Sequence, residues 1–420
     1  MTNDKMSPRH KTMPRIIIHG GAGNITRQSM TKERYDAYHT SLLQILNLSS
    51  EYLSKPGTTA LDAATYAVSL LENDTLYNSG KGAVFSREGK NELECSIMVS
   101  NGYRKRGVGC TMLQHVKNPV KLARELLLKG ETDGGDGSQD HCQYSGGFVE
   151  GLAEKWGLEM VEPDYFFTQQ RWDEHRRGLD EEKRTESGEM SDWERTNYIP
   201  LGTCGAVVLD GFGTVCAATS TGGLTNKVPG RVGDTPTIGA GFWAEEWYEA
   251  SPDLESKMRY QSTPQTPLDR LSRGDLGSLL GDCLPLGSPS SSKRIDAKAS
   301  PVRHAVAMSG TGNGDTFLRL AAASTTANKS RFASTSLANA ISWMAGRGGE
   351  LQKSAGDRWG HSHEGTGGMI GIELIGNTGT VVFDYNCGGM FRAWTEEDGE
   401  QKCLIFREDR YESGASGWSK

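Results

Sequence analysis

The hydrophobic residues of the chain fall into short continuous runs and into runs with helical spacing. Residues 15–18 (RIII) form an apolar run that ends in a glycine-rich turn, which is typical of a buried strand. Residues 58–72 place alanines and leucines on one helical face, after a Thr-Thr pair that can cap a helix. A second helix is predicted by Asn118 at its cap, Pro119 in its first turn and Gly130 just after its end.

A second group of apolar runs follows residue 200. Runs of this length, alternating or continuous, suit strands of a sheet that is covered on both faces. The predicted strands are residues 205–209, 215–219, 304–309, 369–375 and 381–385, and helices are expected at 315–323 and 335–346.

Two segments interrupt this pattern. Residues 171–200 contain 15 charged positions and few apolar anchors, so they predict a flexible, solvated linker. Residues 251–300 contain ten serines and five prolines, which is typical of a surface insertion.

Composition narrows the class of protein. The 53 glycines have no G-x-y period, which excludes a collagen. No run reaches the roughly 20 apolar residues of a membrane helix, and the N-terminus lacks the apolar region of a secretory signal. The net charge of −7 offers no broad basic face for nucleic acid, and the eight cysteines include no C-x-x-C pair of a zinc or thioredoxin-like site. We therefore expect a cytoplasmic protein whose partners include neither nucleic acid nor a membrane.

Gly202 and Thr203 stand directly before a predicted strand and suggest a chain that cuts itself. The Thr203 hydroxyl would attack the Gly202 carbonyl, and hydrolysis of the resulting ester would leave Thr203 as a new N-terminus. Its α-amine, with an ordinary pKa of about 7.7–8.0, could then take the hydroxyl proton. The alternative is a threonine that opens a strand through ordinary β-propensity.

Glycine-rich motifs on both sides of this threonine favour the catalytic interpretation. They are HGGAG at 19–23, NSGKG at 78–82, GTCGA at 202–206, TSTGG at 219–223, GRVGD at 230–234 and GTGNG at 310–314. As an ordered set they resemble the plant-type asparaginase/isoaspartyl peptidase family of N-terminal-nucleophile hydrolases. The wider family includes glycosylasparaginase and taspase. The resemblance covers most of residues 15–170, 200–245 and 303–392.

The resemblance implies a role for each residue that matches a family motif. Thr203 matches the nucleophile, Thr221 the threonine that orients and polarises it, Thr311 and Gly312 the oxyanion donors, Asn78 an asparagine near the nucleophile, and Arg231, Asp234 and Gly314 the substrate pocket. Arg231 would clamp a substrate α-carboxylate, since its planar fork suits that group, and Asp234 would receive the α-ammonium. Without the resemblance, a mutual ion pair at the surface would be the better explanation of Arg231 and Asp234.

The resemblance also implies a fold and a reaction. The fold is α+β, a four-layer αββα sandwich of the N-terminal-nucleophile type. Residues 1–202 form an α subunit and residues 203–420 a β subunit after self-cleavage, together one domain, in a dimer of such heterodimers. The enzyme would release L-aspartate from L-asparagine, from β-aspartyl (isoaspartyl) peptides, or from both, through a β-aspartyl ester on Thr203. Catalysis would need no cofactor.

Relatives hold a structural sodium ion on backbone carbonyls of the loop after the first predicted helix. The matching positions are Leu71, Glu72, Asp74, Tyr77, Ser79 and Lys81.

Three alternatives share the motifs. A glycosylasparaginase would take a sugar-bearing asparagine. A taspase-like endopeptidase would cut after aspartate within proteins, but Asp234 would bind a free α-amine that an internal peptide bond does not offer. A non-catalytic scaffold is the third, because Glu94-Cys95 replaces the usual Asp-Ala, Asn313 lies inside the oxyanion loop and Cys204 follows the nucleophile.

Overall fold

A computed structural model describes residues 12–27, 30–131, 135–182, 202–249 and 301–407. Contacts divide the chain into two units. The first comprises Met1–Glu246 and Ala305–Lys420, and the second Trp247–His304. In the second unit the Trp247 and His304 rings stack with their centroids 5.4 Å apart. The insertion predicted at 251–300 lies outside the described residues.

Eight strands form the larger sheet, in the order β12-β11-β1-β5-β6-β2-β3-β4. They are β1 (Arg15–Gly23), β2 (Leu93–Asn101), β3 (Arg104–Leu113), β4 (Gln143–Ser145), β5 (Cys204–Leu209), β6 (Val215–Thr221), β11 (Gly389–Thr395) and β12 (Gln401–Phe406). Neighbouring strands are antiparallel, except that β3 and β4 are parallel. β5 begins directly after Thr203 and lies between β1 and β6, so the predicted nucleophile stands in the middle of the sheet.

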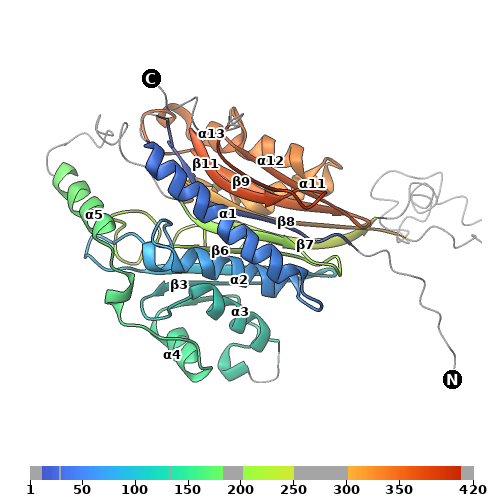
Figure 1. The fold of residues 1–420 in the computed structure, drawn as a ribbon, viewed down its shortest axis with the longest axis horizontal. Helices are drawn as coiled ribbons and strands as arrows, with labels where there is room; N and C mark the ends of the chain where they lie inside the picture. Colours follow the sequence, from blue (N-terminus) through green and yellow to red (C-terminus); the bar gives the residue numbers. More distant parts are fainter. Residues whose placement is uncertain (1–11, 28–29, 132–134, 183–201, 250–300, 408–420) are drawn as a thin grey trace, which may run out of the picture. The chain divides into compact units, whose positions relative to one another are not determined.

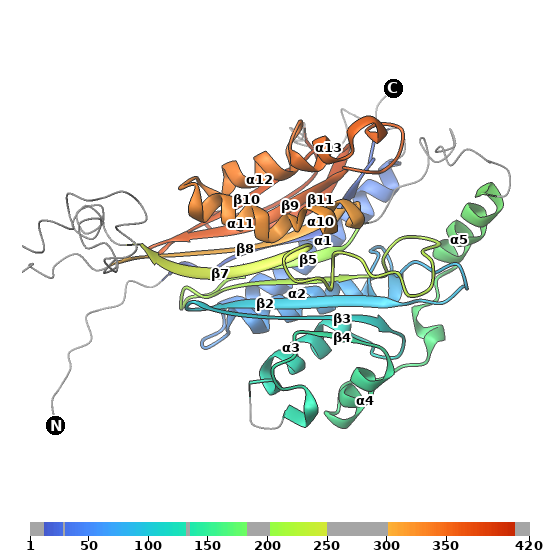
Figure 2. The ribbon, with the colours of Figure 1, turned by 180° about the vertical axis from the view of Figure 1, so that it is seen from behind.

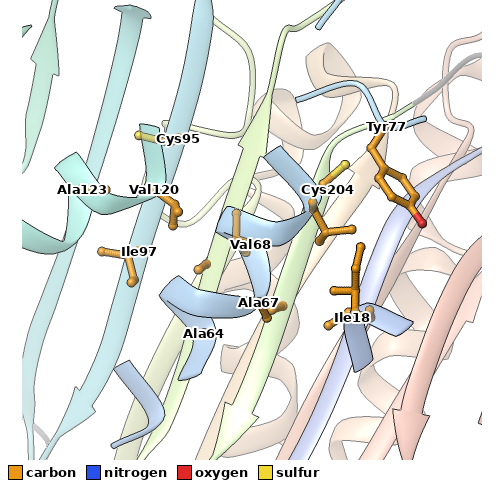
Figure 3. Packing of buried hydrophobic residues seen from close by; sticks show 14 of the residues in the cluster. Ile18, Ala64, Ala67, Val68, Tyr77, Cys95, Ile97, Val120, Ala123 and Cys204 are labelled. Carbon is orange, nitrogen blue, oxygen red and sulfur yellow. The ribbon is translucent and has the colours of Figure 1, made fainter. Parts of the chain in front are cut away.

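Alternate residues of β1 face two separate cores. Ile16 and Ile18 belong to the cluster between this sheet and its helices, and Figure 3 shows Ile18 in this cluster together with Ala67 of α2 (Ala60–Asn73). Ile17 belongs to the second cluster instead. Successive side chains of a strand point to opposite faces, and these isoleucines do so. The buried strand predicted from the apolar run is therefore confirmed.

Helices α1 (Lys32–Ser54), α2 (Ala60–Asn73) and α3 (Pro119–Lys129) cover one face of the larger sheet (Figure 1). α2 confirms the helix predicted over 58–72. Thr59 caps it in a capping box: its hydroxyl accepts from the Asp62 N–H, and the Asp62 carboxylate accepts from the Thr59 N–H. None of the described helices is both long and apolar enough to span a membrane.

The smaller sheet has the strand order β10-β9-β8-β7. Its strands are β7 (Phe242–Glu249), β8 (Val302–Gly312), β9 (Gly367–Ile375) and β10 (Thr378–Tyr385). Between β8 and β9 the chain forms the helices α10 (Gly314–Leu320), α11 (Ala322–Phe332), α12 (Leu337–Ala345) and α13 (Glu350–Ser354). Within the first unit the two sheets share the second apolar cluster, which includes Val207 of β5 and Ile370 of β9. α12 packs on β9 and β10, on the side away from the larger sheet (Figure 2). The first unit is therefore α+β, with two sheets face to face and helices outside each.

The prediction of a flexible linker over 171–200 is wrong for residues 171–182. Residues 171–182 belong to helix α5 (Gln169–Glu182), and 183–200 lie outside the described residues. α5 is held by the aromatic ring of Trp172, which packs on Phe85, and by buried polar contacts. Arg171 is only 2% exposed and donates to the carbonyls of Gly82 (2.9 Å) and Leu76 (3.2 Å). The charge density of the segment concealed these buried contacts.

Two helix predictions are right in place and wrong in detail. Asn118 stands at the N-cap of α3, but its side chain donates to Ser69 and Asn73. The capping bond comes from Glu72, whose carboxylate accepts the Val120 N–H at 2.9 Å. Likewise the helix predicted over 315–323 is split between α10 and α11 by Ala321, which has a left-handed backbone.

Candidate active site

Thr203 lies at the start of β5 with 7% of its surface exposed. The glycine-rich segment predicted as a turn is instead the last part of β1, and it lies against Gly202, the residue before Thr203. A Cβ placed on Gly21 would be 2.8 Å from the Gly202 nitrogen, and the Gly21 backbone has a positive φ of 120°. The HGGAG motif therefore brings β1 into backbone contact with the predicted cleavage site.

Thr311, near the end of β8, also lies against Gly202. Its hydroxyl oxygen accepts a hydrogen bond from the Ala22 N–H at 3.3 Å. A Cβ on Gly202 would overlap that oxygen, so Gly202 and the Thr311 hydroxyl are in direct contact. Because the Thr311 oxygen already accepts from Ala22, its own O–H is left to donate toward a carbonyl at the site. Thr311 is thus in contact with the predicted cleavage site.

The surroundings of Gly205, the second glycine of the GTCGA motif, leave no room for a side chain. His19 of β1 lies opposite Gly205 in the strand register, and its Nε2 is 2.6 Å from the Ser309 hydroxyl. A Cβ on Gly205 would be 2.5 Å from that Nε2 and would overlap the Ser309 oxygen. Burial lowers the pKa of His19 to about 3, which the Thr203 backbone only partly opposes, so the imidazole is neutral.

We expect Gly205→Ala to destabilise the fold by about 1–3 kcal/mol, because the added methyl forces apart His19 and Ser309. The same movement displaces Thr203 two residues away and slows self-cleavage. Thermal melting and denaturing gels measure the two effects. Gly151→Ala, inside helix α4 (Gly147–Lys155) with no atom within 4 Å of the new methyl, is the matched control and should melt no lower than the parent. A Gly205→Ala protein that melts and cleaves like the control would show that the contacts with His19 and Ser309 do not require a glycine at this position.

Thr221 and Asn78 meet at the turn that follows β6. The Thr221 hydroxyl accepts from the Gly223 N–H at 3.0 Å. Asn78 donates to the Gly223 carbonyl at 2.8 Å and accepts from the Val84 N–H at 3.0 Å. These bonds give Asn78 a role in holding the turn beside Thr221 in place.

Arg231 and Asp234 converge on Gly314. A Cβ there would lie 2.5 Å from Asp234 Oδ1 and 3.0 Å from Arg231 Nη2. Among the described residues, the ion-pair partner of Arg231 is Asp315, at 3.0 Å, so the alternative of a mutual Arg231–Asp234 pair is wrong. Within the same described part of the chain, two buried atoms, Arg231 Nε and Asp234 Oδ2, have no hydrogen-bond partner. Buried polar groups normally have hydrogen-bond partners, so these two unpartnered atoms beside Gly314 need an explanation.

Burial raises the pKa of Asp234 to about 7, Arg231 opposes this rise, and the nearby Glu94 adds to it. Glu94 is fully buried and accepts the Gly233 N–H at 3.1 Å, with Lys227 Nζ 3.7 Å away. The glutamate that replaces the usual aspartate therefore supports the backbone between Arg231 and Asp234.

The other two departures from the family pattern also have structural explanations. Asn313 is the N-cap of α10, and its side chain accepts from the Thr316 N–H at 3.0 Å. Cys204 is fully buried, and burial raises the pKa of its thiol to about 12, so it is an inert packing residue. Glu94, Asn313 and Cys204 are thus compatible with the predicted site.

Sequence reasoning missed two features beside the site. The Thr235 hydroxyl oxygen lies 2.9 Å from that of Thr203. Helix α5 contacts the loop that leads to Arg231, since His175 Nδ1 is 2.5 Å from Asn226 Oδ1 and the Asn226 amide donates to the His175 carbonyl. The Asp-Thr dipeptide at 234–235 is too ordinary to signal the first contact, and the second joins residues 51 positions apart.

The profile of a protein family described as asparaginase matches residues 12–251. The chain belongs to the asparaginase family. It is 31% identical over 395 residues to the isoaspartyl peptidase of Salmonella typhimurium, covering 94% of this chain and 98% of that protein. Its identity to the isoaspartyl peptidase of Escherichia coli is also 31% over 395 residues, with 94% and 96% covered. The isoaspartyl peptidase/L-asparaginase of Bos taurus is 32% identical over 232 residues, 55% of this chain and 68% of that one. The chain is thus a hydrolase of the isoaspartyl peptidase/asparaginase family, and the predicted resemblance is confirmed.

Proposed function

We propose that the chain cuts itself between Gly202 and Thr203 and then uses Thr203 to hydrolyse L-asparagine, β-aspartyl peptides, or both. The observation that carries the proposal is the pair of unpartnered buried atoms, Arg231 Nε and Asp234 Oδ2, beside Gly314. They match the α-carboxylate and α-ammonium of an aspartyl or asparaginyl group. The side-chain carbonyl of that group would then face Thr203.

Self-cleavage is an acyl shift followed by hydrolysis. The Thr203 oxygen bonds to the Gly202 carbonyl carbon, the C–N bond to Thr203 breaks, and the hydroxyl proton ends on the Thr203 nitrogen. The Thr311 hydroxyl, in contact with Gly202, donates to the carbonyl oxygen as negative charge develops there. Water then opens the ester, which leaves a Gly202 carboxylate and a Thr203 with a free amine and a free hydroxyl.

Substrate hydrolysis repeats this chemistry on the bound ligand. The Thr203 amine takes the hydroxyl proton, and the oxygen attacks the β-carbonyl of the substrate. The leaving ammonia, or the amine of a β-aspartyl peptide, takes up that proton. Thr311 and the Gly312 N–H stabilise the oxyanion, and Thr221 polarises the nucleophile. Water, deprotonated by the amine, releases aspartate.

The loop after α2 fits a structural sodium ion by its donor chemistry. The six predicted donors are backbone carbonyls, the neutral oxygen ligands that hard cations accept. The loop is closely wound, because a Cβ on Gly80 or Gly82 would overlap the carbonyl of Glu72 or Tyr77. An ion held by Leu71, Glu72, Asp74, Tyr77, Ser79 and Lys81 would stiffen the loop that carries Asn78.

The family also supports the finer statements on architecture. We assign the layers to the four-layer αββα sandwich of N-terminal-nucleophile hydrolases, with residues 1–202 and 203–420 as two chains of one domain. In this proposal two heterodimers assemble into a dimer, and the protein is cytoplasmic. Catalysis needs no cofactor.

Two measurements test the proposal together. Intact-mass analysis should find a fragment that begins at Thr203. Aspartate release should then be compared on L-asparagine, a β-aspartyl dipeptide and a glycosyl-asparagine. Release from either of the first two supports the proposal. Release only from the glycosyl-asparagine, cleavage of proteins after aspartate, or an intact chain that still hydrolyses asparagine would each overturn it. An intact chain without turnover on any substrate would indicate the scaffold relative.

The pKa of Asp234 predicts how substrate affinity depends on pH. Its carboxylate must be ionised to bind the α-ammonium, and a pKa of about 7 means that ionisation is lost as the pH falls through 7. The ionised fraction of the carboxylate falls about fivefold between pH 7 and pH 6, so we expect the KM for asparagine to rise by about the same factor. Steady-state kinetics on succinamate, which lacks the α-amine, provides the control and should show a flat KM. An asparagine KM as flat as that of succinamate would exclude Asp234 as the ammonium ligand.

A further inference from the structure

Thr235 is the residue whose hydroxyl meets the nucleophile. The two oxygens, Thr203 Oγ1 and Thr235 Oγ1, are 2.9 Å apart, and the Thr235 side chain is fully buried. That separation is a normal O–H···O hydrogen bond. No role for Thr235 follows from the reaction proposed above.

The backbone around Thr235 is held from two directions. The Thr219 hydroxyl, itself hydrogen-bonded to the Ser96 hydroxyl, donates to the Thr235 carbonyl at 3.4 Å. On the next residue, the Pro236 carbonyl accepts from the Gln143 side chain at 3.1 Å. Gly109 of β3 lies so close to Pro236 that a Cβ there would overlap its carbonyl oxygen. These contacts fix the backbone from which the Thr235 hydroxyl reaches Thr203.

The position in the chain adds a second constraint. Thr235 directly follows Asp234, and Arg231 lies four residues before it. One short segment therefore holds the two substrate-binding charges and also touches the nucleophile. A fixed segment of this kind sets the distance between the bound amino-acid group and the attacking oxygen, which is the main benefit of orientation in catalysis.

We propose that Thr235 is a positioning residue for Thr203, an inference that rests on the proposed function. Its hydroxyl donates a hydrogen bond to one lone pair of Thr203 Oγ1, which directs the other lone pair to the carbonyl under attack and leaves the Thr203 proton for transfer to its nitrogen. The same bond operates in the intact chain, where that carbonyl is Gly202, and in the cleaved enzyme, where it belongs to the substrate. Thr235 neither gains nor loses a proton overall.

The test compares Thr235→Val, which keeps the shape and removes the hydroxyl, with Thr235→Ser, which keeps the hydroxyl. We expect Thr235→Val to slow self-cleavage and lower kcat by about ten- to a hundredfold, the usual worth of one buried hydrogen bond at a reacting group. The KM for asparagine should stay within about twofold, because Arg231 and Asp234 bind the substrate ends. Thr235→Ser should stay within about threefold of the parent in both rates.

Thr326→Val is the matched control for loss of a buried threonine hydroxyl. Thr326 is equally buried, and its hydroxyl bonds to the Ala322 carbonyl within α11 at 2.7 Å. If Thr235→Val does not fold, Thr235→Ala against Thr235→Ser gives the same comparison. The inference is overturned if Thr235→Val matches the parent, if the serine variant loses as much as the valine variant, or if KM rises while kcat is unchanged. A parent that neither cleaves nor turns over would instead overturn the proposed function.

Discussion

Thr203→Ala is expected to leave one uncut chain of 45.7 kDa and to lower aspartate release by about 10³-fold or more. The physical reason is that one hydroxyl serves both reactions. Without it no ester forms at Gly202, so no terminal amine appears, and no nucleophile faces the substrate. A denaturing gel and a coupled aspartate assay read the two losses, and the parent should give two bands in place of one.

Thr203→Ser supplies the control for this variant. It keeps the hydroxyl and, once cut, the amine, so it should still cleave and turn over, at rates lowered by the missing methyl. Thr203→Ala should melt close to the parent, because the substitution removes only two heavy atoms from a side chain at the end of a strand. An alanine variant that is still cut at this position, or that still hydrolyses asparagine, would show that another group is the nucleophile.

The elements that the sequence predicted well are those whose signal is local. Ile16, Ile17 and Ile18 alternate between two cores, and a short β-branched run that meets a glycine motif is typical of a strand. The capping box of α2 joins residues three apart, Thr59 and Asp62, so the helix start is visible in the sequence. The prediction that Thr203 is the nucleophile did not rest on a local signal, because it needed the ordered set of glycine motifs between residues 19 and 314.

The features that the sequence concealed depend on contacts between distant residues. Arg171 reads as a solvated charge, yet it is buried on carbonyls 89 and 95 positions away in the chain. The cap of α3 comes from Glu72 rather than from the neighbouring Asn118, since burial on α2 places that carboxylate beside the Val120 N–H. The Thr203–Thr235 contact spans 32 residues. No periodicity encodes such pairs, because they arise only when the strands and loops are assembled.

Arg231→Met is expected to lower kcat/KM for asparagine by about 10³-fold, with self-cleavage intact. Methionine keeps much of the apolar stem but loses the fork that would hold the α-carboxylate. The loss is large because Asp234 and Asp315 flank the same position, so an unneutralised substrate carboxylate would meet two acidic side chains. Arg231→Lys, which keeps a charge without the planar fork, should fall between methionine and the parent. Asp315→Asn should cost less than tenfold, because the Asp315 side chain is 44% exposed.

A substrate without the α-carboxylate separates this role from general damage to the site. The parent should hydrolyse β-alaninamide, which is asparagine without its carboxylate, about as poorly as Arg231→Met hydrolyses asparagine. Combining the variant with that substrate should then add little further loss, because the same interaction has already been removed. Additive losses would mean that Arg231 supports the fold of the site rather than the substrate. In that case the unpartnered Arg231 Nε would need another ligand, and the preference for an amino-acid end would rest on Asp234 alone.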